Sequence, residues 1–257
     1  MKLLRNLFLI SLFIPNEFYI NLGSMRLELY RVILAISVLL VFLNGKGLNL
    51  KFNNYDKSLF FICFWTVLGY CINSGFSQGL QSGGIYTLEI LGAYLLARAS
   101  IQSNFQLFDS FRIIGVLVTL TFLPALYETI TGNRVLHQIA TQMTGHYTLS
   151  NTLYTDAYVR YGLTRSTSVF SHPIMYGVMC ASIIPFTFAY FKFSGKKTAA
   201  FALGASLGGV ACALSSAAIL AIVIQIAVAF IVLNKQYFSN NRHILIAAAI
   251  IAIAVVE

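Results

Sequence analysis

Arg165 and His172, whose side chains can bind an anion or transfer a proton, lie at the ends of a short polar segment. This segment leads directly into Pro173 and a long apolar run. A proline favours the first turn of a helix and pushes the residue before it out of the helical region, so His172 is expected just outside a helix N-terminus. The free N–H groups and positive dipole end of such a helix favour an anion. A guanidinium binds two phosphate oxygens at once and keeps its charge, so Arg165 predicts a clamp for a diphosphate. The alternative is that Arg165 anchors the chain at lipid headgroups and Ser171 only caps the helix.

Other ionisable residues gather toward the same end of neighbouring apolar runs. They are Glu28, Arg31, Glu89 and Glu128. A charge within hydrocarbon is costly, so such residues are usually paired or functional. Glu28 and Arg31 are three positions apart on one helical face, and a purely structural ion pair is the alternative there.

Glu128 lies near the end of an apolar run that Gly132 is suited to terminate, and Arg134 is placed to pair back to its carboxylate. Because these charges should turn away from lipid, we expect them to share a hydrated pocket. The prediction is an outward-open cavity lined by Glu128, Arg165 and His172, with Glu89 close by and with Glu28 and Arg31 as further lining residues.

The elements that must position these residues are membrane helices. Hydrophobic residues make up 58% of the chain and charged residues only 10%, whereas about a quarter of an ordinary soluble domain is charged. The apolar runs approach the roughly 20 residues that cross a bilayer. Inside lipid every backbone N–H and C=O needs a partner within the protein, so each run is predicted to be a helix. The predicted fold class is therefore all-α, a polytopic integral membrane helical bundle.

About nine transmembrane helices are expected, in a single domain over residues 1–257. They cover residues 3–22, 27–43, 59–73, 84–99, 111–130, 173–191, 198–214, 217–233 and 244–256. The first run also resembles the start of a signal peptide, but no small-x-small cleavage site follows it. The last run has 13 residues and spans about 20 Å, too little for a full crossing. We therefore expect the chain to be truncated at the C-terminus, a piece of a longer protein.

The distribution of Lys and Arg predicts the orientation, because cytoplasmic loops are enriched in both. With a cytoplasmic N-terminus, twelve of the 17 Lys and Arg residues fall on the inner side. The net charge of +9 then reflects topology and lipid headgroups, so a bilayer and not a nucleic acid is the expected partner.

Residues 131–171 form the one long loop in this arrangement, and it lies on the outer side. Loops of this length are uncommon unless they have a function or are disordered. Aromatic and polar side chains in the loop are suited to stacking on and hydrogen-bonding a sugar, and a tyrosine-rich interfacial belt is the alternative. These residues are Tyr147, Asn151, Tyr154, Asp156, Tyr158 and Tyr161.

Metal and cofactor chemistry are not expected. The four cysteines fall inside predicted helices without C-x-x-C spacing, and the four histidines show no metal-ligand spacing. No glycine-rich phosphate loop or soluble nucleotide-binding unit is present in the sequence, which disfavours ATP-driven transport by this chain alone.

Two segments resemble the bacterial O-antigen ligase and O-antigen polymerase superfamily of multi-helix membrane glycosyltransferases. One is YETITGNR at residues 127–134, at a helix end, and the other is RSTSVFSHPIMYG at residues 165–177, which opens the next helix. The second is the more specific. The resemblance covers about 100 residues, from 125 to a small-residue turn at 214–218.

The resemblance implies transfer or polymerisation of a glycan from a polyprenyl-diphosphate-linked donor at the outer face of the bacterial cytoplasmic (inner) membrane. A hydroxyl of a glycan or lipid acceptor attacks the anomeric carbon, and lipid diphosphate leaves. Arg165, with Arg134 or Arg160, would stabilise the leaving group electrostatically. Glu128 and His172 are the candidates to take the acceptor proton. No cofactor is implied.

Two other readings stay open. A flippase for the same lipid-linked glycan would also need arginines around a diphosphate, although it should line a path across the whole membrane with polar groups. Members of the superfamily often carry an arginine in the tight turn where this chain has Ser215 and Ser216, and a second large outer loop further downstream. The chain can therefore also be an inactive, truncated homologue.

Overall fold

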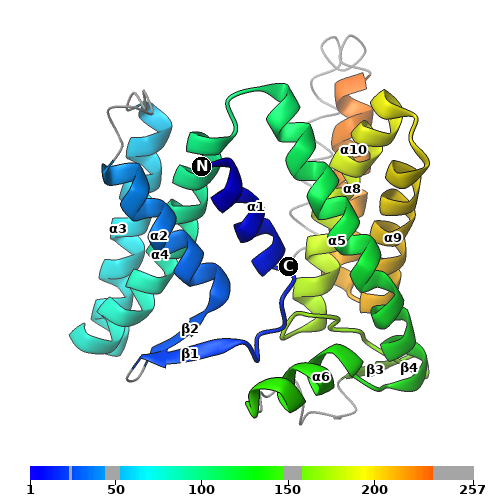
Figure 1. The fold of residues 1–257 in the computed structure, drawn as a ribbon, viewed down its shortest axis with the longest axis horizontal. Helices are drawn as coiled ribbons and strands as arrows, with labels where there is room; N and C mark the ends of the chain where they lie inside the picture. The colour runs from blue at the N-terminus through cyan, green and yellow to red at the C-terminus, as the bar shows by residue number, and fades with distance from the viewer. Residues whose placement is uncertain (23–24, 44–52, 147–157, 234–257) are drawn as a thin grey trace, which may run out of the picture.

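The structure, a computed structural model, describes residues 1–22, 25–43, 53–146 and 158–233. Within these ranges the chain forms a bundle of nine helices with two short β-hairpins at one end (Figure 1). The helices are α1 (Lys2–Ser11), α2 (Leu29–Leu43), α3 (Asn54–Ser74), α4 (Phe76–Ser100), α5 (Asn104–Thr131), α6 (Val135–Thr144), α8 (Pro173–Ser194), α9 (Lys197–Ala213) and α10 (Ser216–Leu233).

Three of the described helices, α3, α5 and α8, are long and apolar enough to cross a membrane. The helices α2, α9 and α10 are apolar but shorter in their described parts. Large apolar side chains cover the outside of the bundle, as in α3, where Phe61 and Trp65 are 65% and 63% exposed. A water-soluble protein rarely shows such a continuous apolar surface, so it favours lipid contact. The predicted helical membrane bundle is confirmed in this coarser form, with three helices of spanning length.

The first predicted helix, over residues 3–22, is wrong. Helix α1 ends at Ser11, and Pro15 then prevents a continuous helix because proline has no N–H and its ring clashes with the preceding turn. The strand β1 (Tyr19–Leu22) follows and pairs antiparallel with β2 (Met25–Glu28). As a result α2 begins at Leu29, two residues later than predicted.

The predicted loop over residues 131–171 is only partly a loop. It contains the helix α6 and a second hairpin, β3 (Val159–Arg160) with β4 (Leu163–Thr164). Buried polar contacts tie α6 to the N-terminal segment: the His137 ring nitrogen Nδ1 lies 3.0 Å from Glu17 Oε1, and neither side chain is exposed. The loop residues Tyr147, Asn151, Tyr154 and Asp156 and the predicted helix 244–256 lie outside the described residues.

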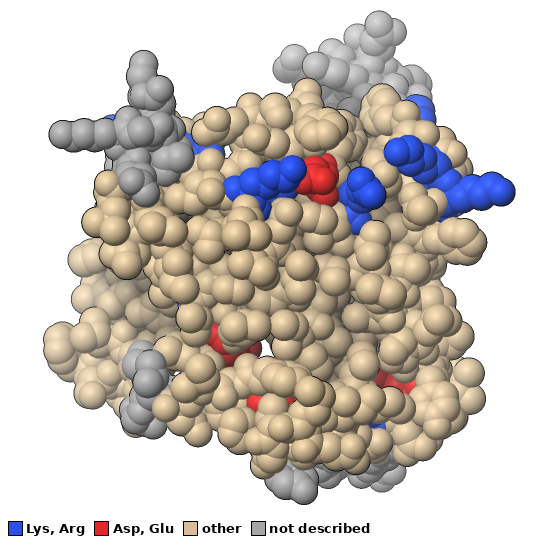
Figure 2. Space-filling model, in the orientation of Figure 1, with Lys and Arg blue, Asp and Glu red and all other residues tan. Residues whose placement is uncertain are grey.

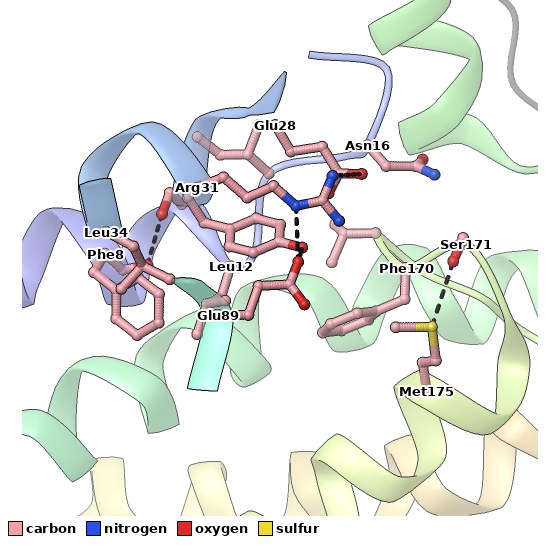
Figure 3. A pocket seen from close by; sticks show the side chains of 14 residues that line it. Phe8, Leu12, Asn16, Glu28, Arg31, Leu34, Glu89, Phe170, Ser171 and Met175 are labelled. Carbon is pink, nitrogen blue, oxygen red and sulfur yellow. Dashed lines mark hydrogen bonds and ion pairs between the residues drawn. The ribbon is translucent and has the colours of Figure 1, made fainter. Parts of the chain in front are cut away.

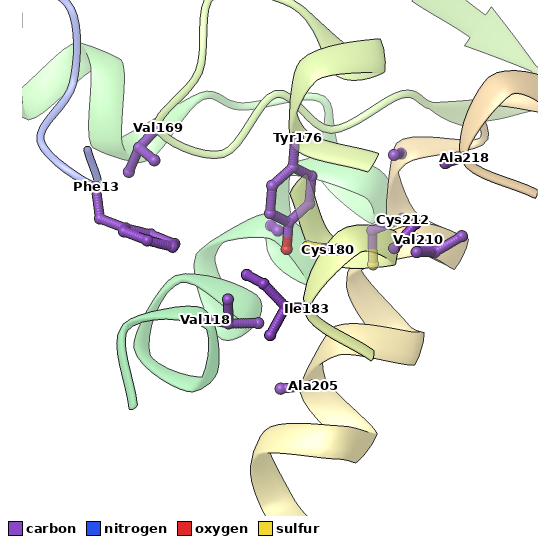
Figure 4. Close-up of a cluster of buried hydrophobic side chains, with 13 residues drawn as sticks. Phe13, Val118, Val169, Tyr176, Cys180, Ile183, Ala205, Val210, Cys212 and Ala218 are labelled. Atoms are coloured by element: carbon purple, nitrogen blue, oxygen red, sulfur yellow. The ribbon is translucent and has the colours of Figure 1, made fainter. Parts of the chain in front are cut away.

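The helices form two groups. Helices α2, α3 and α4 pack together on one side, α5, α8, α9 and α10 pack on the other, and α1 contacts α2, α4 and α5 between them (Figure 1). The apolar core of the second group gathers Val118, Tyr176, Cys180 and Ile183 against small residues of α9 (Figure 4). This core holds the N-terminal end of α8 in a fixed place beside the C-terminal ends of α5 and α9.

The two ends of the bundle differ in charge. Figure 2 shows Lys and Arg side chains gathered along the end where α5 begins, opposite the β-hairpins. Arg5 is buried there and donates to Asp109 Oδ2 over 2.7 Å. Lys192, Lys196 and Lys197 lie at the junction of α8 and α9 at the same end. This asymmetry matches the Lys-rich side that the sequence predicts for the cytoplasm.

Helices α3 and α4 approach closely because α4 carries glycines four residues apart, Gly79 and Gly83, a spacing that allows close packing in membranes. A Cβ added at Gly79 would lie 2.3 Å from Cys71 Cα, and one at Gly83 would lie 2.8 Å from Val67 Cα. These neighbours are backbone atoms, so a side chain would force the helices apart. Gly84, the next residue, has nothing within 4 Å of an added Cβ.

We expect Gly83→Val to lower the free energy of unfolding by about 1–3 kcal/mol, the usual cost of overpacking, and Gly84→Val to leave it nearly unchanged. The two variants add the same side chain at adjacent positions, so helix propensity is matched. Thermal unfolding of the detergent-solubilised protein, followed by fluorescence-detected size exclusion, measures both. Equal melting temperatures for the two variants would contradict the close α3–α4 contact.

Candidate functional site

The segment 165–172 is held by the carboxylate of Glu128. Oε2 of Glu128 accepts from Ser166 Oγ at 2.7 Å and from the backbone N–H of Ser168 at 3.0 Å. Oε1 accepts from the Thr167 backbone N–H at 3.0 Å and from its hydroxyl at 2.9 Å. Glu128 is only 2% exposed, and four donors satisfy its charge. A carboxylate bonded in this way positions the segment.

Arg134 completes this anchor. Helix α5 ends at Thr131. Gly132 follows it with a left-handed backbone (φ 77°) that turns the chain back, and the Gly132 N–H donates to the Glu128 carbonyl. Arg134 Nε then lies 3.3 Å from Glu128 Oε1, with both side chains buried. The predicted pairing of Arg134 with Glu128 across the helix end is confirmed.

Arg134 and His172 lie beside the ring of Tyr158. The guanidinium carbon of Arg134 lies 4.9 Å from the centre of that ring, and the His172 ring centre lies 5.8 Å from it. The backbone N–H of Arg165 donates to the Tyr158 carbonyl over 2.8 Å. Arg160 lies on the adjoining hairpin strand β3. The described structure thus brings Arg134, Arg165 and His172 together beside Tyr158, with Arg160 acting on Arg165 from the adjoining strand.

Arg160 and Arg165 both reach the C-terminal end of α9. Arg160 Nη1 donates to the Leu214 carbonyl over 3.1 Å, and Arg165 Nε donates to the Ala213 carbonyl over 3.4 Å. Cations are favourable at this helix end because its carbonyls carry partial negative charge. Burial lowers the pKa of Arg165, and the neighbouring Arg160 lowers it further. Among the described residues no carboxylate forms an ion pair with Arg165, as expected of a site that receives an anion.

His172 caps α8 and lies just outside it, as predicted. Its backbone is extended (φ −144°, ψ 141°), and its Nδ1 accepts the N–H of Ile174 over 3.2 Å. Pro173 has no N–H, the Ile174 N–H donates to His172 Nδ1 and the Met175 N–H donates to the His172 carbonyl. The first turn of α8 therefore has no free N–H groups of the kind that the sequence predicted. The predicted anion site on bare helix N–H groups is wrong, and the arginines supply the positive charge.

The pKa of His172 is lowered below its usual value, first by burial and then by the positive charges of Arg165 and Arg134. The ring is therefore neutral near pH 7, and with Nδ1 accepting a hydrogen bond its proton is assigned to Nε2. In this state Nε2 can donate to an anion. The nitrogen that would take a proton is already occupied by the Ile174 N–H.

The acidic pocket, a cavity of about 390 Å³, lies where the two helix groups meet, beside the segment 165–172 (Figure 3). Its wall contains Glu28, Arg31 and Glu89 from three elements, as predicted for pocket-lining residues. Glu128, Arg165 and His172 are not part of that wall, so the prediction of one cavity lined by all six residues is wrong. The segment itself joins the two places, since Val169, Phe170 and Ser171 line the cavity while Ser166 to Ser168 bind Glu128.

Within the acidic pocket, Glu89 is paired and Glu28 is loosely held. Glu89 Oε1 accepts from Arg31 Nε at 2.7 Å and from the Tyr30 hydroxyl at 2.6 Å. Glu28 Oε1 lies 3.7 Å from Arg31 Nη1, so the ion pair considered from the sequence is present but long. Asn16 also lines the cavity, and its buried Oδ1 has no hydrogen-bond donor within the described residues.

Tyr30 and Asn16, which line the acidic pocket, were not singled out from the sequence. Ser166, Thr167 and Ser168 were also not identified from it as hydrogen-bond donors to Glu128. Tyr30 is next to Arg31, which was singled out from the sequence, and Asn16 is next to Glu17, which was not, but nothing in the local sequence shows that either residue lines a cavity. The three hydroxyl residues directly after Arg165 were the one feature of the sequence that could have suggested hydrogen bonds from this segment to a buried carboxylate. Tyr161, considered as a sugar-stacking residue, is 95% exposed at the tip of the β3–β4 hairpin.

Across the described part of the chain, no three His, Cys, Asp or Glu side chains lie close enough together to hold a metal ion. The four cysteines are free. No family model, curated protein or solved structure matches this chain.

Proposed function

We propose that this protein is an O-antigen ligase- or polymerase-like membrane glycosyltransferase of cell-surface polysaccharide biosynthesis. Its donor is a glycan linked through diphosphate to a polyprenyl lipid, bound at the outer face of the bacterial cytoplasmic membrane, with the protein's N-terminus in the cytoplasm. Its acceptor is a hydroxyl group of a second glycan or of a lipid. The observation that carries the proposal is the arginine cluster: Arg134, Arg165 and His172 lie beside Tyr158, and Arg160 lies next to Arg165 at the end of α9, at the end of the bundle opposite the lysines.

The chemistry of a diphosphate leaving group fits this cluster. When the acceptor oxygen bonds to the anomeric carbon, the bond from that carbon to the diphosphate oxygen breaks and negative charge collects on the diphosphate. Fixed guanidinium groups stabilise such charge without needing to reorganise. Arg165 and Arg160 are held by carbonyls of the α9 end, and each keeps further N–H groups for phosphate oxygens. His172 Nε2–H adds one more donor.

The lipid part of the donor has a matching surface. The polyprenyl chain needs apolar contact next to its charged head, and the outer surfaces of α5 and α8 expose large apolar side chains such as Leu123, Ile130 and Ile174. Because these helices end and begin beside the arginine cluster, a diphosphate held there leaves its lipid chain against apolar residues.

A flippase is the alternative, and the packing of the described helices disfavours it. A flippase needs a polar path for its glycan across the membrane. The space between α5, α8 and α9 is instead filled by an apolar core that includes Val118, Tyr176 and Ile183.

Deleting the gene from its source organism tests the function. A transferase mutant should lose the polymer or ligated surface glycan and should accumulate lipid-linked glycan in the outer leaflet. Oxidation by periodate added to intact spheroplasts would then destroy most of that glycan. Accumulated glycan that is protected until the membrane is permeabilised would indicate a flippase, and unchanged surface glycan with no accumulation would contradict both functions.

A further inference from the structure

Transfer needs a group that takes the proton of the acceptor hydroxyl, and the two candidates from the sequence are both occupied. Glu128 accepts four hydrogen bonds and pairs with Arg134 in a buried site. The Nδ1 lone pair of His172 accepts the N–H of Ile174. A proton acceptor needs an open lone pair within reach of the substrate, so the base should lie elsewhere.

Among the described carboxylates at this end of the bundle, Glu28 alone is without a hydrogen bond. Glu17 is fully buried against His137, and Glu89 accepts from Tyr30 and Arg31. Among the ion pairs of the described residues, the Glu28 carboxylate has only the long 3.7 Å contact with Arg31. Glu28 lines the acidic pocket, and its side chain is 23% exposed. It is therefore reachable from the cavity, where Figure 3 shows it beside Arg31.

The acidic pocket also has the shape and charge of a site for a neutral, hydroxyl-rich molecule. Its volume of about 390 Å³ falls within the range of small-molecule sites. Phe170, Leu12 and Met175 provide apolar wall, and the partly exposed carboxylates of Glu28 and Glu89 offer hydrogen-bond acceptors. The wall holds two carboxylates and one arginine, while Arg26 acts on Glu28 from outside the wall. The wall itself thus carries one more negative than positive charge, which disfavours phosphate and suits neutral or amino sugars.

We infer that the acidic pocket binds the acceptor, a neutral or amino sugar, and that Glu28 takes the proton from its attacking hydroxyl; this rests on the proposed function. The diphosphate and the acceptor then occupy sites of opposite charge, joined by the segment 165–172. The acceptor oxygen forms a bond to the anomeric carbon and its proton passes to a Glu28 oxygen. The bond between that carbon and diphosphate breaks, and its electron pair leaves with the diphosphate.

The surroundings of Glu28 suit a base. Burial raises its pKa, and the positive charges of Arg31 on α2 and Arg26 on β2 only partly oppose that effect. The negative charges of Glu89 on α4 and of Glu17, in the segment before β1, raise the pKa further. Activity should therefore rise with pH through a value above the ordinary range of a glutamate, as Glu28 loses its proton.

The test uses the full chain in nanodiscs, with lipid-linked glycan extracted from the deletion strain as the donor. Glu28→Gln should lower the transfer rate about 10²-fold or more, Glu28→Asp should recover part of it, and the Gln variant should lose the acidic limb of the pH profile. Binding of undecaprenyl diphosphate should stay within about twofold of wild type in both variants, since the arginines are untouched. Asp109→Asn, a carboxylate-to-amide change at the opposite end that weakens the ion pair with Arg5, should leave the rate per folded protein unchanged.

A second readout does not need transfer. Dicyclohexylcarbodiimide reacts with protonated carboxyls in apolar surroundings, so mass spectrometry should find Glu28 labelled ahead of Glu17 and Glu89. Transfer by the Glu28→Gln variant at the wild-type rate, or labelling of other carboxylates but not Glu28, would overturn the assignment of Glu28 as the base. Neither result would contradict the proposed transferase function. Labelling at Glu28 with no transfer by the wild-type protein would instead reject the proposed function.

Discussion

Replacing Arg165 by lysine or alanine is expected to lower glycan transfer by about 10²- to 10³-fold, the usual effect of removing one preorganised donor from a developing negative charge. Lysine keeps the positive charge but presents a single ammonium group in place of a planar fork, so it should rescue little of the loss. The rate is measured in nanodiscs with lipid-linked glycan as donor.

The matched control for this change is Arg112→Lys, an exposed arginine near the beginning of α5 at the opposite end of the bundle. It should keep the wild-type rate. Transfer by both Arg165 variants at the wild-type rate, with normal amounts of folded protein, would show that Arg165 only caps the end of α9 through the Ala213 carbonyl.

Replacing Glu128 by glutamine should destabilise the protein by about 3–5 kcal/mol, the usual cost of breaking a buried ion pair. The amide has one acceptor oxygen and one donor group, whereas four donors from Ser166, Thr167 and Ser168 converge on the carboxylate. At least two of these donors would meet an N–H₂ group. The segment 165–172 should then become sensitive to proteases, and the melting temperature in detergent should fall.

Glu28→Gln is the matched control because it is the same substitution at a carboxylate without a hydrogen bond. It should change the melting temperature little. Equal stability of the two variants would contradict the role of Glu128 as the anchor of the segment. A Glu128 variant that stays fully folded but loses all transfer would return Glu128 to the role of catalytic base.

The helical, apolar character of this protein is determined by the sequence alone, because long apolar runs leave the backbone no partner but itself. The bounds of α8 and α10 fell within about three residues of prediction, and His172 was placed outside α8 because proline restricts its neighbour. The pairing of Arg134 with Glu128 was also predictable, since a glycine-terminated helix end brings them together within six residues.

Tertiary structure decided which charged groups have partners. In the sequence Arg31 is the local partner of Glu28, yet in the structure Tyr30 and Arg31 bind Glu89 and leave Glu28 open to the cavity. The four donors to Glu128 lie 38 to 40 residues away, a separation that no local pattern reports. Local sequence fixes helix ends through backbone geometry, but the partner of a buried carboxylate depends on which distant segments pack against it.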